Sequence, residues 1–179
     1  MECADSPHLP QCFLSLLCAI FLDSVAIPVH HFNGVAGEMH SQIDLDPTHG
    51  VIRLTVMEEM VSLECAEDCY RHLSQVAYSG GPYAAIYDLS MAKGTTIPTE
   101  MVRNFARRRP PMPAGKEGKA RVVVGKEPSI YGLARLFQIC GDNIGKEFEV
   151  VHTLDEAYGI TGARPEDFTQ RLFPETMTA

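Results

Sequence analysis

The chain has 179 residues, of which 45% are hydrophobic and 21% are charged, so most of it should fold rather than stay disordered. Its net charge of -8 argues against a general nucleic-acid-binding protein, because such proteins need a basic surface that neutralises phosphates. The length fits one ordinary domain and a tail.

The first 38 residues differ from the rest of the chain. They contain no Lys or Arg, and Cys12 to Leu22 is an apolar run interrupted only by Ser15. The run is shorter than the roughly 20 apolar residues of a membrane helix, and it lacks the preceding positive charge of a secretory signal. Three interpretations are open: a weak signal or anchor, a helix packed on the domain, or a segment outside the functional protein, which would then begin at Met39. We favour the last.

Two strands joined by a tight turn are predicted directly after Met39. The first is Ser41 to Asp46, and the second is Val51 to Val56, where apolar and polar residues alternate. Pro47 and Gly50 favour a tight turn between them, so the two strands should form an antiparallel hairpin.

Helices and strands then alternate. Ser62 is the predicted N-cap of a helix that reaches about Ala77 and has one apolar face. Tyr83 to Leu89 is a nearly continuous apolar run, which is typical of a strand covered on both faces. Pro98 favours the first position of the next helix. We expect one face of that helix to carry Ile97, Met101 and Phe105, and its C-terminal end to carry Arg107, Arg108 and Arg109.

A second strand and helix of this kind follow. Lys119 to Gly125 predicts a buried strand, and Pro128 opens a helix that Gly141 is placed to end. Gly132 lies inside this helix, and we explain it by close packing against the sheet, because glycine otherwise costs about 1 kcal/mol there. The expected core positions of the helix are Ile130, Leu133, Ala134, Phe137 and Cys140.

The last elements are predicted from about position 147 onward. Glu147 to His152 should be a strand, and Thr153 with Glu156 has the form of a capping box for a short helix ending near Gly162. Pro165 to Phe173 predicts a final helix with Phe168 and Leu172 facing inward.

The order β-β-α-β-α-β-α-β-α predicts an α/β fold with a mostly parallel sheet, an N-terminal antiparallel hairpin and helices packed on the sheet. The predicted domain spans residues 39–162. Residues 1–38 form the separate apolar segment, and residues 163–179 the C-terminal helix and tail.

The six cysteines lie at positions 3, 12, 18, 65, 69 and 140, with no CxxC pair among them. Cys65 and Cys69 share one side of a helix, and His72 is one turn further, so a metal site can be drawn there. We favour inert buried thiols in a reducing, cytoplasmic compartment instead. We therefore expect neither a metal nor a cofactor.

Two segments resemble a known family: YAAIYDLSMAKGTTIPTEMV, from Tyr83, and PSIYGLARLFQICGD, from Pro128. With the order of elements, they resemble the STAS domain of anti-sigma-factor antagonists, and more closely uncharacterised bacterial proteins of STAS-like or CRAL-TRIO-like fold. The motifs that carry the resemblance are Asp88-Leu89-Ser90 after a strand and Gly132-Leu133-Ala134-Arg135-Leu136-Phe137-Gln138 in a helix. The resemblance covers about Gln42 to Gly162, and its motifs concern the fold more than the activity.

Phosphorylated STAS antagonists carry Asp-Ser-Ser-Gly at the start of the helix after the third strand. This chain has Thr95-Thr96-Ile97-Pro98-Thr99 there, so the switch serine is missing and phosphoregulation of the family's kind is in doubt. Thr96 or Thr99 could substitute, but helix capping is their simpler role.

Ligands of parallel α/β sheets gather beyond the C-terminal ends of the strands. Asp88, Lys126 and His152 should lie at that edge as an acid, a cation and a base, together with Ser90, Lys93 and Thr96. No nucleophile elbow, P-loop, GxGxxG or HExxH motif accompanies them, so we treat them as candidate ligand or partner contacts rather than catalytic residues.

A basic stretch offers a second candidate contact. Residues 107–121 hold six Lys or Arg against one Glu, and Arg107, Arg108 and Arg109 begin the stretch. Cations at a helix C-terminus complement its dipole, which explains the three arginines without a ligand. An acidic partner surface, an anionic lipid or an anionic metabolite is the alternative.

The leading hypothesis is a non-enzymatic STAS-like module that acts through protein contacts in a bacterial regulatory setting. The runner-up is a domain that binds a small molecule or lipid in an apolar pocket between helices and sheet, as the CRAL-TRIO resemblance implies. The third is an enzyme that uses the strand-end residues. A regulatory protein partner, a small apolar or anionic ligand and a homodimer are left open as partners, and nucleic acid is not expected.

Overall fold

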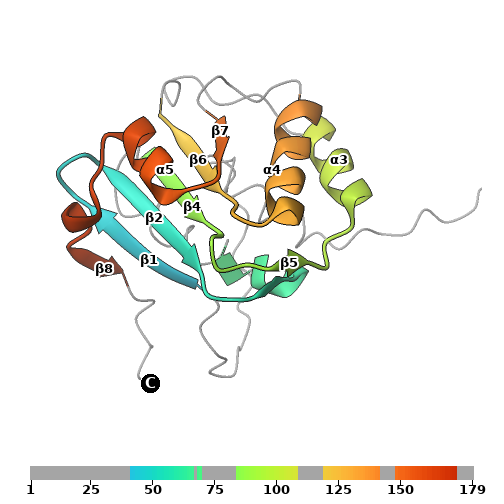
Figure 1. The fold of residues 1–179 in the computed structure, drawn as a ribbon, viewed down its shortest axis with the longest axis horizontal. Coiled ribbons are helices and arrows are strands. Elements are labelled where there is room, and N and C mark those ends of the chain that lie inside the picture. The colour runs from blue at the N-terminus through green and yellow to red at the C-terminus, as the bar shows by residue number, and fades with distance from the viewer. Residues whose placement is uncertain (1–40, 67, 70–83, 109–118, 142–147, 173–179) are drawn as a thin grey trace, which may run out of the picture.

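The computed structural model describes residues 41–66, 68–69, 84–108, 119–141 and 148–172 (Figure 1). They form a six-stranded sheet with helices packed on it, which confirms the predicted α/β class and the mostly parallel sheet. The strands, in their order across the sheet, are β7 (Phe148–Val151), β6 (Arg121–Val124), β4 (Ala84–Asp88), β2 (Val51–Val56), β1 (Ser41–Asp46) and β8 (Gln170–Leu172).

The parallel half of the sheet is built in chain order. Strand β2 pairs parallel with β4, β4 with β6, and β6 with β7. Each strand in this series lies on the same side of the strand before it. Because crossovers between parallel strands are right-handed as a rule, the helices that connect these strands all lie on one face of the sheet. That face carries the helical residues 63–66, 68 and 69, α3 (Thr99–Arg108) and α4 (Pro128–Cys140), whose buried side chains share one core.

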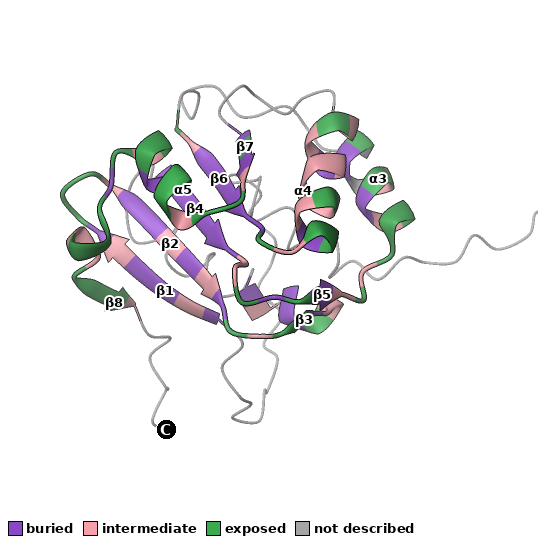
Figure 2. Cartoon of the chain, in the orientation of Figure 1, coloured by how far each residue is buried: buried purple, intermediate pink, exposed green. Residues whose placement is uncertain are grey.

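The opposite face is covered by α5 (Leu154–Thr161). Its residues Ala157 and Tyr158 pack with a second core formed by Val51, Ala84, Ile86, Val122 and Val124. Figure 2 shows the consequence for burial, since the strands beneath the helices are buried while the outer faces of α3 and α5 are exposed. No helix in the described part of the chain is long and apolar enough to cross a membrane.

Strands β1 and β2 pair antiparallel from Ser41 opposite Val56 to Asp46 opposite Val51. The turn between them places Gly50 at φ 64°, a left-handed conformation that glycine adopts at little cost. The Asp46 carboxylate closes the turn, because its Oδ1 accepts the backbone N–H groups of Thr48 at 2.8 Å and His49 at 3.1 Å.

Two short strands were not anticipated from the sequence. Strand β3 (Met60–Val61) and strand β5 (Gly94–Thr95) pair parallel and form a sheet of their own. Each follows the C-terminal end of a long strand, β2 or β4, so the small sheet lies beyond that edge of the main one (Figure 2).

The two caps predicted from sequence motifs are present. Ser62 Oγ accepts the N–H of Cys65 at 3.1 Å, as an N-cap does. Thr153 and Glu156 form the capping box of α5, where backbone and hydroxyl hydrogen bonds from Thr153 lower the pKa of the Glu156 carboxyl. Gly162 ends this helix at φ 75°.

Helix α4 confirms the predicted core stripe and corrects the account of Gly132. Ile130 and Phe137 are buried, and Leu133, Ala134 and Cys140 pack against the same core. Gly132 is exposed, and a Cβ built on it would have no neighbour within 4 Å. The expected close packing of Gly132 against the sheet is therefore wrong.

Replacing Gly132 by alanine should raise the free energy of unfolding by about 0.5–1 kcal/mol, because it removes the cost of glycine in a helix interior without a clash. Urea denaturation measures the change. Gly162→Ala is the matched control, since its positive φ makes the same substitution destabilising, by about 1 kcal/mol. A loss of stability in Gly132→Ala would contradict the open surroundings of this position.

Helix α3 begins at Thr99, one residue after Pro98, whose carbonyl accepts the N–H groups of Met101 and Val102. Its buried positions are Val102 and Ala106, whereas Met101 is only half-buried. The apolar face is thus one residue later than the predicted face at Met101 and Phe105. The side chain of Phe105 lies outside the described residues.

The predicted C-terminal helix from Pro165 to Phe173 is wrong. Pro165–Asp167 forms one 3-10 turn, and the chain then continues as β8, which pairs antiparallel with β1. Phe168 and Leu172 do face the two cores, as expected. The predicted start of the domain at Met39 lies outside the described residues. The same is true of the predicted continuation toward Ala77 of the helix that Ser62 caps.

Candidate functional site

An apolar cavity of about 100 Å³ lies between the sheet and the helices of the α3/α4 face. The sheet contributes Leu54, Tyr87 and Val123 to its wall, and the helical residues at 65, 66 and 69 form the opposite side. Helix α4 contributes Ile130, Leu133, Ala134 and Phe137. All of these residues belong to the core of that face or pack against it, so the cavity is a half-open space bounded by core side chains.

The small sheet of β3 and β5 contributes to one part of the cavity wall. Val61 and Thr95 line the cavity there, together with Leu89 and Ile97. The Thr95 hydroxyl donates to Val61 O at 2.8 Å and accepts the N–H of Ile97 at 3.0 Å. The hydroxyl of Thr95 is therefore already hydrogen-bonded within the wall.

The thiols of Cys65 and Cys69 also line the cavity, and both are buried. The neighbouring Cys65 thiol and burial raise the pKa of Cys69. The thiol of Cys69 is thus protonated at neutral pH and is a poor metal ligand or nucleophile. His72, the third member of the metal site considered from the sequence, lies outside the described residues.

The predicted strand-end residues reach one edge of the sheet, since Asp88 pairs level with Val124, and Val124 with Val151. Their side chains engage different neighbours. Asp88 is buried and its Oδ1 accepts the N–H of Ser90 at 3.0 Å. His152 is exposed and stacks on Tyr131 of α4, with ring centroids 3.9 Å apart.

Among the described residues, no hydrogen bond or ion pair joins Asp88, Lys126 and His152 to one another. Lys126 is exposed. The arrangement does not form an acid, cation and base around one reacting atom.

The other candidate contacts are spread along the edge of the β3/β5 pair and α3. Lys93 is exposed and forms an ion pair with Glu59, and the N–H of Thr96 donates to Val61 O at 3.1 Å. Arg107 is exposed on α3. The side chain of Arg108 and all of Arg109 lie outside the described residues, so the basic patch stays a prediction.

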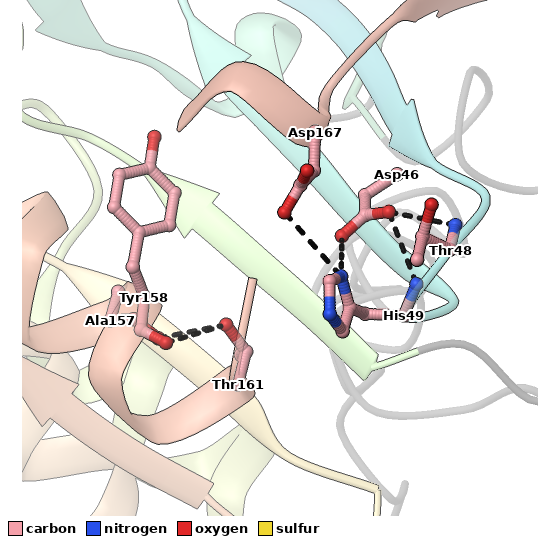
Figure 3. Close-up of polar contacts among 7 residues, drawn as sticks. All are labelled: Asp46, Thr48, His49, Ala157, Tyr158, Thr161 and Asp167. Atoms are coloured by element: carbon pink, nitrogen blue, oxygen red, sulfur yellow. Dashed lines mark hydrogen bonds and ion pairs between the residues drawn. The ribbon is translucent and has the colours of Figure 1, made fainter. Parts of the chain in front are cut away.

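A carboxylate and imidazole cluster occurs on the other face of the sheet, and the sequence reasoning did not find it. His49 Nδ1 donates to Asp46 Oδ2 at 2.7 Å and lies 3.6 Å from Asp167 Oδ2. Figure 3 shows both carboxylates pointing toward the imidazole. In the described part of the chain this is the group that could hold a metal ion, since its three ligand atoms lie within 4.8 Å of one another.

The same cluster also has a structural role. Asp46 is fully buried and organises the β1–β2 turn, while the contact from His49 to Asp167 ties that turn to the segment before β8. Turn closure and the contact between His49 and Asp167 give these side chains a structural role, and we assign no ligand to them.

A second polar network lies beside it on β1 and β2. The buried Asp44 accepts hydrogen bonds from Arg53 at 2.9 Å, Gln42 at 2.8 Å and Arg171 at 3.3 Å. Arg53 also donates to the Tyr158 hydroxyl at 2.7 Å and lies 4.6 Å from the centre of the Phe168 ring. The network joins β1, β2, β8 and α5, so it stabilises the fold.

Comparisons with protein-family models, curated proteins and solved structures found no match to this chain.

The cavity was anticipated only as an alternative, from the resemblance to CRAL-TRIO-like proteins. In the sequence, its lining residues look like ordinary core positions. A cavity forms where side chains from several elements do not fill the space between them, and no local sequence pattern shows this. The Asp44 and Arg53 pair had a signal in the sequence: a turn at 47–50 places these opposite charges directly across the hairpin.

Proposed function

We propose that the protein is a non-enzymatic module that binds a small, uncharged apolar molecule in the cavity between the sheet and α4. The observation that carries the proposal is the cavity itself, about 100 Å³ in volume and lined by aliphatic, aromatic and thiol side chains. The cavity is half-open and only apolar side chains face it, so an apolar molecule can enter it and is stabilised there by leaving water. An apolar wall gives water too few hydrogen bonds to be a stable occupant.

The volume limits the size of the ligand. A dry apolar cavity of about 150 Å³ accommodates benzene or xenon. This cavity is smaller, at about 100 Å³, so xenon or a short aliphatic group fits without rearrangement. A charged group is disfavoured, because the wall offers it no partner to offset desolvation.

Native mass spectrometry of the gently purified full chain tests the proposal. We expect an added mass from a small uncharged molecule, and a xenon-dependent shift in the ¹²⁹Xe NMR signal of protein freed of it. Ala134→Leu adds three carbons to the cavity wall on a helix that favours leucine, so it should abolish both signals without loss of stability.

Ala120→Leu is the matched control. Ala120 precedes β6, packs against the core of the α5 face and does not line the cavity, so this variant should keep the added mass and the xenon shift. The absence of both signals in the unsubstituted protein would refute the proposed function. Equal loss in Ala120→Leu would show that the cavity is not the site.

The leading interpretation from the sequence, a STAS-like module that acts through protein contacts, is a second candidate. It is supported by the order of elements along the chain, because apart from the small β3/β5 sheet the strands and helices from β1 to α5 follow the order on which the STAS resemblance rests. Its contact surface would include Ser90 and Lys126 at the strand ends. A captured protein partner should then be lost in a Ser90→Arg, Lys126→Glu variant and kept in Thr161→Val, which alters the other face.

A further inference from the structure

The half-open cavity faces the carboxyl edge of the sheet, where the parallel strands end. Most of its lining residues are buried, and those that keep some exposure mark the mouth: Leu89, Thr95, Ile97, Leu133 and Ala134. Leu89 directly follows β4, and Thr95 belongs to the small sheet beyond that edge. Helix α4, which carries Leu133 and Ala134, begins shortly after β6 ends. The mouth therefore lies where ligands of parallel α/β sheets gather.

Three of the five large apolar side chains that are exposed among the described residues lie at this carboxyl edge. Met57 follows β2, Met60 lies in β3, and Met91 lies in the loop after β4, with exposed fractions of 47%, 48% and 50%. Methionine adapts its shape to different apolar partners and recurs on surfaces that bind them. The carboxyl edge thus carries apolar surface outside the cavity as well as inside it.

The N-terminal part of the chain enters the fold at the same edge. Ser41 begins β1 and pairs with Val56, the last residue of β2. The Ser41 side chain also forms a hydrogen bond with Cys69, which lines the cavity. The chain before residue 41 is therefore attached beside the cavity, on the face of the sheet that carries α3 and α4.

That part of the chain includes the apolar run from Cys12 to Leu22, in which Ser15 is the one polar residue and no residue is charged. In water such a run exposes more contiguous apolar surface than soluble proteins usually leave uncovered. The tether between the run and Ser41 is residues 23–40, and these eighteen residues reach about 60 Å when extended. The run can therefore reach the mouth, and docking there removes no charge from water.

We propose that the apolar run of residues 12–22 docks on the mouth of the cavity of its own chain and competes there with the small apolar ligand. The competition rests on the proposed function for the identity of the ligand. The docking rests on the apolar mouth, the exposed methionines and the entry of the chain at Ser41. It departs from the interpretation favoured from the sequence, which placed residues 1–38 outside the functional protein.

The tether makes the same chain the preferred occupant. A linker of this length holds the run near the cavity at an effective concentration of about 1 mM, which a second copy at about 1 µM does not match. A contact with an intrinsic dissociation constant of about 0.1 mM then leaves the cavity free for about a tenth of the time. Release of the run should therefore strengthen ligand binding about tenfold.

Disulfide trapping in the full chain tests the docking. Under mild oxidation by copper phenanthroline, the Met60→Cys variant should form a disulfide between position 60 and Cys12 or Cys18, which peptide mass mapping locates. Met91→Cys is a second probe at the carboxyl edge. Ile160→Cys is the matched control, because Ile160 is exposed to a similar extent, at 44%, on α5 at the other face of the sheet. Trapping should be about tenfold faster at the two methionine positions than at position 160.

Xenon binding tests the competition. The Leu16→Glu, Leu17→Glu double variant places two charges in the run and should lower the xenon dissociation constant about tenfold, as measured by ¹²⁹Xe NMR. Ser6→Glu, Ser24→Glu is the matched control, since it adds the same charge on either side of the run. Its xenon dissociation constant should equal that of the unsubstituted protein.

The outcomes separate the docking from the proposed function. Equal trapping at positions 60, 91 and 160 would overturn the docking, even where xenon binds as proposed. Preferential trapping at positions 60 and 91 without xenon binding in any variant would support the docking and refute the apolar ligand. Disulfides found only between two chains would show that the run covers a second copy and would overturn docking on its own chain. Preferential trapping with an unchanged xenon dissociation constant in Leu16→Glu, Leu17→Glu would overturn the competition.

Discussion

Asp44→Ala is expected to lower the free energy of unfolding by about 3 kcal/mol, because it leaves the largely buried Arg53 without its carboxylate. Asp44 is 4% exposed and receives hydrogen bonds from Arg53, Gln42 and Arg171. Urea denaturation at pH 7 measures the loss. Glu166→Ala removes an exposed acid from the segment before β8 and should change the stability by less than about 0.5 kcal/mol.

The effect of Asp44 should depend on pH. Burial alone raises the pKa of Asp44, but the hydrogen bonds and the charge of Arg53, with help from Gln42 and Arg171, outweigh it and lower the pKa. A carboxyl with a depressed folded-state pKa stabilises the protein above its unfolded pKa, which is about 3.9. That contribution disappears as the pH falls below about 4 through the folded-state value.

The stability difference between the unsubstituted protein and Asp44→Ala should therefore be constant from pH 5 to 7 and should shrink below about pH 4. A difference that grows on acidification would contradict the sign of the shift. An Arg53→Met, Asp44→Ala double variant should recover part of the loss, since it no longer buries an unpaired charge.

Local patterns were enough to predict most of the long elements. The alternation in Val51–Val56, the apolar run around Ala84–Asp88 and the spacing of Ile130 and Phe137 each follow from burial on one or both faces. The capping box of Thr153 and Glu156 was readable because both partners lie within one turn.

The sequence could not predict β8, because its pairing partner fixes its conformation. Phe168 and Leu172 are four residues apart, the spacing of a helix face, yet they pack on opposite sides of the sheet. Gln170 and Arg171 are exposed, so no apolar alternation marks the strand. Its register against β1 and the Arg171 contact to Asp44 depend on residues more than a hundred positions away.

The candidate site was even less accessible to sequence reasoning. Asp88, Lys126 and His152 were selected because strand ends share an edge, and that edge exists. The pattern does not specify which side chains turn toward each other, and here His152 stacks on Tyr131 while Asp88 binds the backbone of Ser90. The cavity depends on the volumes of side chains from several elements, which no local pattern encodes.

Phe137→Ala should have the other large effect, a loss of about 3–5 kcal/mol in the free energy of unfolding. Phe137 is 2% exposed, and its ring meets that of Phe148 edge to face at 5.8 Å. It also lines the cavity, so removal of the ring adds its space to the existing 100 Å³. The enlarged cavity should bind fluorobenzene more tightly than the cavity of the unsubstituted protein, since a cavity of about 150 Å³ accommodates benzene.

Ligand binding should then return part of the lost stability. Fluorobenzene at about 100 times its dissociation constant would stabilise Phe137→Ala by about 2.7 kcal/mol, which urea denaturation with and without the compound measures. Ile139→Ala, on the exposed side of the same helix at 72% exposure, should lose little stability and gain no binding. If Phe137→Ala does not fold, Phe137→Leu retains part of the contact and should show the same effects at smaller size. Fluorobenzene binding that is equal in all these proteins would show that the ring of Phe137 does not bound the cavity.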